Sequence, residues 1–267
     1  MGPNPVDEHT FTTARGPVYC RSAPAAGVPR LFLHGIPTSS DDWLPFLEHG
    51  GGVAPDLIGF GRSSKGGQLD YSLDGLAAFV AELLDQLEIE RVSLVAHQWG
   101  AAVGAVLGAR YPGRVERLTL FNPVPLIDGF EWPGVTRWLR RPLLGELLMG
   151  ATTRRMLAGA LRRGAATDEA WSPARLGPVW EQFDQGTQRA ILRLHRGTSA
   201  DALEPVLGEL RVPARVLWGD RDPWLGPELG DAYAGRLSAG GIEHLDAGHW
   251  AWLDRPELVE RLAPERP

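Results

Sequence analysis

Hydrophobic residues follow two alternating patterns in the first half of the chain. Short apolar runs at 30–33, 92–95 and 118–121 are typical of buried strands. Residues 73–87 instead place apolar side chains at helical spacing, and a segment rich in small residues, 101–110, is also predicted to be a helix. Strands that alternate with helices favour a parallel sheet covered by helices on both faces.

Three further segments complete this first half. Residues 11–20 are predicted to form two short strands joined at the turn 14–17, which is a hairpin signal. Residues 53–56 lead from a strand into the loop 57–64. Asp41 or Asp42 is expected to cap a short helix that runs through position 47.

The alternation stops near Asp128, and helical patterns replace it. Helices are predicted at 135–139, 143–148, 154–161, 179–183 and 188–194. Strand signals then resume at 214–218 and 241–245, and a helix is predicted over 252–262. We therefore predict one α/β core, residues 1–127 and 206–267, with an inserted helical cap, residues 128–205.

Composition and charge limit the partners and the cellular compartment that we expect. The 267 residues carry a formal net charge of -6, which does not favour nucleic acid as a partner. A single cysteine, Cys20, excludes an internal disulfide and favours a reducing cytoplasm. The start of the chain lacks the features of a secretory signal, and no apolar stretch reaches the length of about 18 residues that spans a membrane. We expect a small-molecule substrate, no membrane partner, and a monomer or homodimer.

Four segments follow predicted strands, at the edge where parallel sheets bind ligands. They are His34-Gly35-Ile36-Pro37, Ala96-His97-Gln98-Trp99-Gly100, Gly219-Asp220-Arg221-Asp222 and Gly248-His249-Trp250. In the second, small residues flank a central Gln98 between a strand and a helix. This is the pattern of a nucleophile elbow, in which a sharp turn pushes the central side chain into the crevice.

These motifs resemble the α/β-hydrolase fold, whose order of nucleophile, acid and histidine is matched by Gln98, Asp222 and His249. The run His97-Gln98-Trp99-Gly100 and the loop 56–63 are similar to the branch of haloalkane dehalogenases and epoxide hydrolases, where the elbow has aspartate. The resemblance covers nearly the whole chain. It implies a mostly parallel, doubly wound sheet with a helical cap, and hydrolytic chemistry that needs no cofactor.

One departure from that branch concerns the nucleophile. Glutamine is neutral and its amide oxygen is a poor nucleophile, so the covalent ester mechanism loses its basis at Gln98. Trp99 matches the tryptophan that helps to hold halide in dehalogenases, but Ile36 replaces a polar residue used for the same purpose. The lid tyrosines of epoxide hydrolases are missing between 128 and 205.

An Asp222–His249 pair can still deprotonate water, because the carboxylate orients the imidazole and stabilises its charged form. The backbone N–H groups of Ile36 and Trp99 are expected to bind an oxyanion or a polar ligand, and His34 and Pro37 are expected to belong to the same substrate-binding site. Gln98 is interpreted as a group that positions water or a substrate carbonyl. A vestigial residue, a ligand anchor or an introduced substitution are the alternatives.

Other residues receive simpler interpretations. Asp222 is preferred to Asp220 as the acid because it lies three residues after Gly219, while Asp220 braces the turn. His34 and His97 are expected mainly to brace their loops. The remaining histidines lack metal-ligand spacing, so no metal site is predicted. The arginine pairs of the cap are interpreted as solvated helix faces, with an acidic ligand or a membrane surface as the alternative.

The sequence leaves three functions open. The first is a capped hydrolase that acts on a small, largely apolar organic molecule, with His249 and Asp222 as its base. The second is an inactive relative that binds a ligand without turnover. The third is a lyase or isomerase in which His249 moves a proton and Gln98 orients the substrate.

Overall fold

The computed structural model describes residues 2–238 and 240–262. Its centre is a sheet of eight strands in the order β1-β2-β4-β3-β5-β6-β7-β8. The strands are β1 Asp7–Thr13, β2 Gly16–Ala23, β3 Arg30–Leu33, β4 Gly52–Pro55, β5 Val92–His97, β6 Val115–Phe121, β7 Ala214–Gly219 and β8 Gly240–Leu245. Only β1–β2 and β2–β4 pair antiparallel, so the predicted mostly parallel sheet is confirmed.

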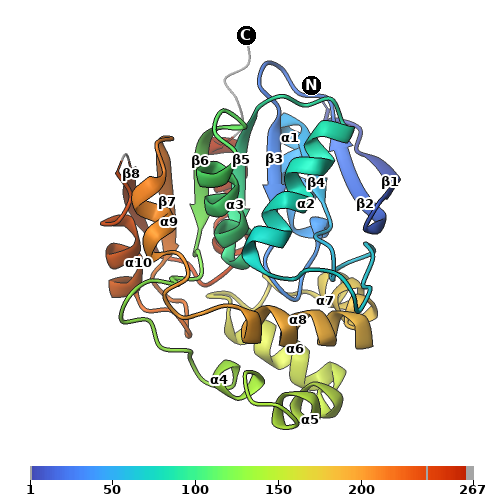
Figure 1. Ribbon diagram of the computed structural model, residues 1–267, viewed down its shortest axis with the longest axis vertical. Coiled ribbons are helices and arrows are strands. Elements are labelled where there is room, and N and C mark those ends of the chain that lie inside the picture. The colour runs from blue at the N-terminus through green and yellow to red at the C-terminus, as the bar shows by residue number, and fades with distance from the viewer. Residues whose placement is uncertain (1, 239, 263–267) are drawn as a thin grey trace.

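Helices cover both faces of this sheet. Figure 1 shows α2 and α3 in front of it, while α1 and α12 pack against each other on the opposite face. The helices outside the segment between β6 and β7 are η1 Ser40–Trp43, α1 Leu44–Gly50, α2 Leu73–Gln86, α3 Gln98–Arg110, α10 Pro227–Ala234, α11 Ala251–Asp254 and α12 Glu257–Arg261. The doubly wound arrangement predicted from the alternation of patterns is therefore present.

Between β6 and β7 the chain forms only helices and turns. These are α4 Thr136–Leu139, α5 Leu144–Ala151, α6 Arg154–Arg163, α7 Pro173–Gln182, α8 Gln185–Gly197 and α9 Glu204–Glu209. Figure 1 shows α4 to α8 gathered below the sheet, where β6 ends. We keep the name cap for residues 128–205; the division of the chain into core and cap stays a prediction. Along the described residues, no helix is long and apolar enough to cross a membrane.

Two local predictions were wrong. Neither Asp41 nor Asp42 caps the helix after β3; the Ser39 side chain accepts the hydrogen bond from the Asp41 N–H, and both aspartates lie inside the first turn. The predicted helix over 252–262 is split into α11 and α12. Pro256 disfavours helical backbone in the preceding residue, and Arg255 accordingly has φ -128° and ψ 73°.

Aromatic side chains form a cluster at the carboxyl ends of the strands. Trp43 stacks on Trp252 at a ring-centroid distance of 4.8 Å, and Phe46 and Phe121 contact both rings. The edge of His97 meets Trp252 at 5.0 Å. Because removing one such buried ring costs roughly 3–5 kcal/mol, the cluster holds the end of β5 firmly in place.

Candidate active site

Gln98 lies at a sharp turn between β5 and α3. Its φ is +50°, a left-handed conformation that side chains other than glycine rarely adopt, whereas His97 before it is extended. Gly100 permits the turn, because a Cβ there would lie 2.4 Å from the backbone oxygen of Leu33. The small residues flanking Gln98 thus have a steric role.

The carboxamide of Gln98 is held by backbone from the neighbouring loop. Its Oε1 accepts a hydrogen bond of 2.7 Å from the Ile36 N–H. Gly35 is required beside it, since a Cβ would lie 2.8 Å from that oxygen and 2.7 Å from His97 Nδ1. The Ile36 N–H that the sequence assigned to a ligand therefore already has a partner. Pro37 follows through a cis peptide bond and is half-buried.

Asp222 and His249 are brought together from the ends of β7 and β8. Asp222 Oδ2 lies 2.5 Å from His249 Nδ1, and both side chains are buried. Asp222 Oδ1 accepts from the N–H groups of Trp224 at 2.9 Å and Leu225 at 3.2 Å. Because Asp222 accepts these hydrogen bonds, Nδ1 of His249 is assigned as the donor to Asp222, and in the neutral imidazole Nε2 then carries the lone pair.

The lone pair of His249 is available for chemistry. His249 Nε2 is buried and has no hydrogen-bond partner within the described part of the chain. Trp224 and Trp250 present their rings to the imidazole at centroid distances of 5.1 and 4.7 Å. Among these same residues no hydrogen bond joins Gln98 to His249; instead His97, next to Gln98, packs on His249 at 4.6 Å. The arrangement offers an oriented base in an apolar enclosure.

Asn122 is a site residue that the sequence analysis missed. It follows β6, is fully buried and has a φ of +36°. Its Nδ2 donates to Asp222 Oδ2 at 3.0 Å, and its Oδ1 accepts from the Gly219 N–H at 2.9 Å. A polar residue directly after a buried strand was the available signal, because the same rule identified the other four segments.

His34 does not take the ligand-binding role that was predicted for it. Its Nδ1 donates to the Gly35 carbonyl at 2.7 Å, and its Nε2 accepts from the Leu57 N–H at 2.9 Å. Burial lowers the pKa of His34, so the ring is neutral, as this hydrogen-bond pattern requires. With both nitrogens occupied, His34 braces its loop, which agrees with the other interpretation made from sequence.

His97 also braces the site. Its Nε2 donates to the His249 carbonyl at 3.0 Å. Burial, and secondly the nearby His249, lower the pKa of His97 well below its usual value. The neutral ring therefore links the elbow to the loop that carries His249.

A wall of aromatic rings lies beside the elbow. Trp99 stacks on Trp132 of the cap at 6.0 Å, and His195 from α8 meets both rings at 5.1 and 5.4 Å. Burial lowers the pKa of His195 to about 4, so it is neutral at physiological pH. The wall suits an apolar ligand.

The cap also holds the histidine loop. The His249 N–H donates to the Gly164 carbonyl at 2.6 Å. Asp254 accepts from the N–H groups of Gly248 at 2.8 Å, Ala166 at 2.9 Å and Thr167 at 2.9 Å. One carboxylate therefore joins the cap segment after α6 to the residue directly before the base.

A second carboxyl group lies near the Ile36 loop. Thr38 Oγ1 is 2.6 Å from Asp42 Oδ2 and 3.0 Å from the Gly35 carbonyl. A hydroxyl has one proton, so both contacts are hydrogen bonds only if Asp42 is protonated and donates to Thr38. Burial raises the pKa of Asp42 to about 8; the neighbouring Asp41 also raises it, whereas the Thr38 hydrogen bond and Arg175 lower it.

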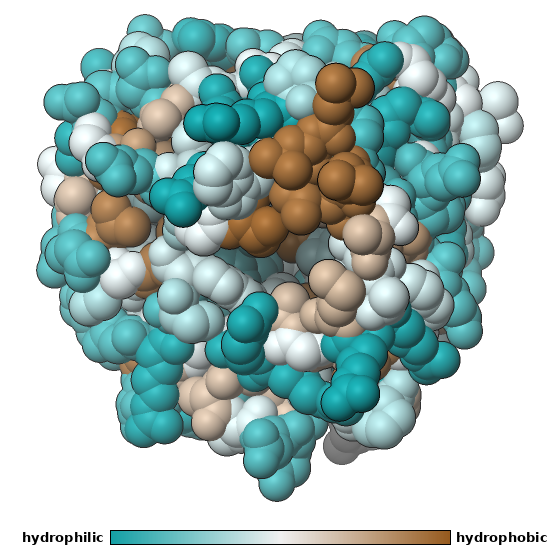
Figure 2. Space-filling model, turned by 90° about the horizontal axis from the view of Figure 1, so that it is seen from below, coloured by the Kyte–Doolittle hydropathy of each residue, from teal (hydrophilic) through white to brown (hydrophobic). Residues whose placement is uncertain are grey.

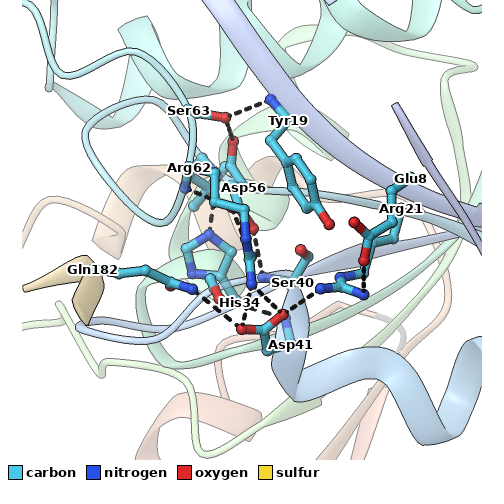
Figure 3. A network of polar contacts seen from close by, with 12 residues as sticks. Glu8, Tyr19, Arg21, His34, Ser40, Asp41, Asp56, Arg62, Ser63 and Gln182 are labelled. Carbon is cyan, nitrogen blue, oxygen red and sulfur yellow. Dashed lines mark hydrogen bonds and ion pairs between the residues drawn. The ribbon is translucent and has the colours of Figure 1, made fainter. Parts of the chain in front are cut away.

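Next to this group, Asp41 anchors a charged network that fixes the loop 56–64 (Figure 3). Asp41 pairs with Arg21 at 2.7 Å and Arg62 at 2.8 Å, and accepts from Gln182 of α7 at 3.2 Å. Asp56 accepts from the Arg62 N–H at 2.7 Å. The network joins three core segments to the cap.

No cluster of three potential metal-ligating side chains occurs across residues 2–238 and 240–262.

Comparisons with known proteins agree with this geometry. The family described as alpha/beta hydrolase fold matches residues 31–256. A haloalkane dehalogenase of Mycolicibacterium paratuberculosis is 31% identical over 261 residues, which cover 91% of this chain and 85% of that protein. A haloalkane dehalogenase of Mesorhizobium japonicum is 29% identical over 90% of this chain and 84% of the relative.

Solved structures show the same fold. The haloalkane dehalogenase DbeA from Bradyrhizobium elkani superposes with a TM-score of 0.79 at 24% identity, and covers 96% of each chain. The epoxide hydrolase CorEH has a TM-score of 0.80 at 18% identity, over 96% of each chain. The chain belongs to the α/β-hydrolase family, with haloalkane dehalogenases among its homologues.

Proposed function

We propose that this protein hydrolyses a small, largely apolar organic molecule by direct attack of water. The observation that carries the proposal is the state of His249: Nδ1 is fixed on Asp222, and Nε2 is buried with no partner among the residues that the structure describes. A water molecule beside Nε2 gives its proton to the imidazole, and Asp222 stabilises the imidazolium that forms. The resulting hydroxide attacks carbon, and the leaving group departs with the bonding electrons.

Gln98 does not act as the nucleophile in this proposal. Its carboxamide is neutral, and its oxygen is held by the Ile36 N–H at 2.7 Å. The same carboxamide has an NH₂ group that can donate to the leaving group or to a substrate oxygen. Gln98 therefore orients the reactants, and the aromatic wall at Trp99 and Trp132 binds the apolar part of the substrate.

The homologues guide the choice of substrates to test. Their names point to haloalkanes, and a structural neighbour is an epoxide hydrolase. A panel of haloalkanes, epoxides and esters covers the reactions in which hydroxide replaces a leaving group or opens a ring. We expect turnover in this panel without an added cofactor.

The decisive variant is His249→Ala. Removing the base is expected to lower kcat by roughly 10²–10⁴-fold, because proton transfer from water is lost. His244→Ala is the matched control: His244 is an exposed histidine that pairs with Asp220 and Asp231. Equal activity of the two variants would contradict the assignment of His249.

Labelled water tests the absence of a covalent intermediate. In a single turnover in H₂¹⁸O, the product should contain solvent oxygen, while the peptide that contains Gln98 keeps its mass. A substrate adduct or ¹⁸O on that peptide would show that position 98 attacks the substrate, and would overturn direct water attack.

A ligand-binding protein without turnover is the second candidate. It is favoured because Gln98 is neutral and its Oε1 is already hydrogen-bonded to the Ile36 N–H, so the turn carries no anionic nucleophile. Saturable binding of panel compounds with no product would support this function. Product formed without oxygen from solvent would instead indicate the lyase or isomerase chemistry that the sequence left open.

A further inference from the structure

The cap carries an apolar patch on the side away from the sheet. Among residues 2–238 and 240–262, the large apolar side chains that are exposed all fall within 135–156. They are Val135 at 56%, Leu143 at 84%, Leu147 at 68% and Met156 at 58% exposure. Figure 2 looks at the molecule from this side and shows a hydrophobic area that borders a hollow. Such a cluster on an otherwise polar surface is typical of an interaction site.

The same segment is strongly basic. Residues 135–163 contain seven arginines and one acidic residue, Glu146, which gives a formal charge of +6. The whole chain has a formal charge of -6, so the remaining residues together carry -12. This asymmetry favours contact of residues 135–163, rather than of the rest of the chain, with an anionic surface.

These arginines differ from those of the core in their partners. Arg15 and Arg114, for example, pair with Glu82 and Asp85 of the core. Within the described residues, none of the exposed arginines of this segment pairs with an acidic side chain: Arg137, Arg141, Arg154, Arg155, Arg162 and Arg163. Their charge is available to a partner.

A hollow next to the patch has the same sign of charge. It lies between α5 and α8, has a volume of about 490 Å³, and is lined in part by Arg189, Arg193, Arg196 and Glu146. Arg189 and Arg193 donate to backbone carbonyls, and of these three arginines only Arg196 pairs with a carboxylate of the described chain. Positive charge therefore continues from the patch into the recess.

We propose that this face of the cap docks reversibly on an anionic lipid surface. Protruding leucines can enter the boundary between headgroups and acyl chains, and unpaired arginines of the same segment can bind lipid phosphates. A two-fold contact between two copies is disfavoured, because it would place +6 against +6. From the sequence we expected no membrane partner, with a membrane surface only as the alternative interpretation of the arginine pairs, since a one-dimensional pattern does not show which leucines of the cap remain uncovered.

Vesicle flotation of the full chain tests the proposal. The protein is mixed with vesicles of phosphatidylcholine alone, or of phosphatidylcholine with phosphatidylserine. We expect binding only to the anionic vesicles. Raising the salt from about 0.1 M to about 1 M shortens the screening length from about 10 Å to about 3 Å and should weaken binding at least about tenfold.

Two patch variants separate the apolar and the charged contributions. The pair Leu143→Ser and Leu147→Ser, and the pair Arg154→Gln and Arg155→Gln, should each weaken vesicle binding by about fivefold or more. The matched control is Arg91→Gln with Arg211→Gln. It removes the same charge from exposed arginines that precede β5 and β7, at the opposite edge of the sheet, and should leave binding unchanged.

Three outcomes would overturn the proposal. They are the absence of binding to anionic vesicles at low salt, equal binding to neutral vesicles, and equal weakening by the control pair. If the chain self-associates without lipid and the Leu143–Leu147 pair of substitutions abolishes that association, a second copy occupies this face. An unchanged thermal unfolding temperature shows that the variants are folded. Vesicle binding is measured without a substrate, so the test does not depend on turnover.

Discussion

The two sides of the active site differ in how their polar groups are engaged. On one side, Asp222 is surrounded by donors that orient His249, and the imidazole keeps a free lone pair. On the other side, Gln98 and Ile36 satisfy each other. The histidine side of the site is therefore oriented by hydrogen bonds, whereas an anionic nucleophile is missing on the other side. This difference is the basis of the proposed direct attack by water.

Introducing a negative charge at position 98 should have the largest effect. Gln98→Asp places a carboxylate at the turn, and we expect a gain in haloalkane or epoxide turnover of roughly 100-fold, which corresponds to about 2.7 kcal/mol of transition-state free energy. With His249→Ala in the same chain, a substrate ester should accumulate and be detected by mass spectrometry. Gln98→Asn is the control, because it has the size of aspartate without its charge. An equal gain in both variants would refute the role of charge.

Removing a hydrogen bond to Asp222, the residue that orients His249, should have an intermediate effect. Asn122→Ala removes one donor from Asp222 and leaves the Gly219 N–H without its partner. We expect a loss of about 1–3 kcal/mol in the free energy of unfolding, measured by urea denaturation, and about a tenfold lower kcat. Asn4→Ala, at a partly buried asparagine far from the site in sequence, is the control. Unchanged kcat in Asn122→Ala would show that Asp222 is held without it.

The smallest effect concerns Asp42 and depends on pH. Its folded pKa of about 8 exceeds its unfolded value, so the folded state keeps a proton that the unfolded state loses. The free energy of unfolding should therefore fall as pH rises from about 4 to about 8, and level off above. Asp42→Asn lacks this fall and should be more stable at pH 8 by on the order of 1–3 kcal/mol.

The control for that comparison is Asp74→Asn, at an exposed carboxylate. It should follow the wild-type pH profile. If Asp42→Asn has the same profile as wild type, Asp42 is ionised in the folded state, and Thr38 donates to it instead of to the Gly35 carbonyl.

Much of the fold could be predicted because it depends on patterns that are local in sequence. Apolar runs mark β3, β5 and β6, and helical spacing marks α2. Small residues around Gln98 indicate the turn, since a Cβ at Gly100 would strike β3. The break between α11 and α12 also has a local signal, Pro256. The helical spacing over 252–262 nevertheless led to the prediction of one continuous helix.

Features that depend on distant contacts could not be predicted in the same way. The partner of Asn122 lies 100 positions away, at Asp222, and that of the Ile36 N–H lies 62 positions away, at Gln98. Leu147 and Leu157 both fit helical spacing, yet one is exposed and the other buried. Only the packing of the cap decides between them.

The junction at Asp254 gives the protein a mechanical constraint. Its carboxylate binds both Gly248 and the cap residues Ala166 and Thr167, while Gly164 binds His249 itself. Any displacement of this part of the cap must stretch or break these bonds. The position of the loop that carries the His249 imidazole is therefore coupled to the position of residues 164–167.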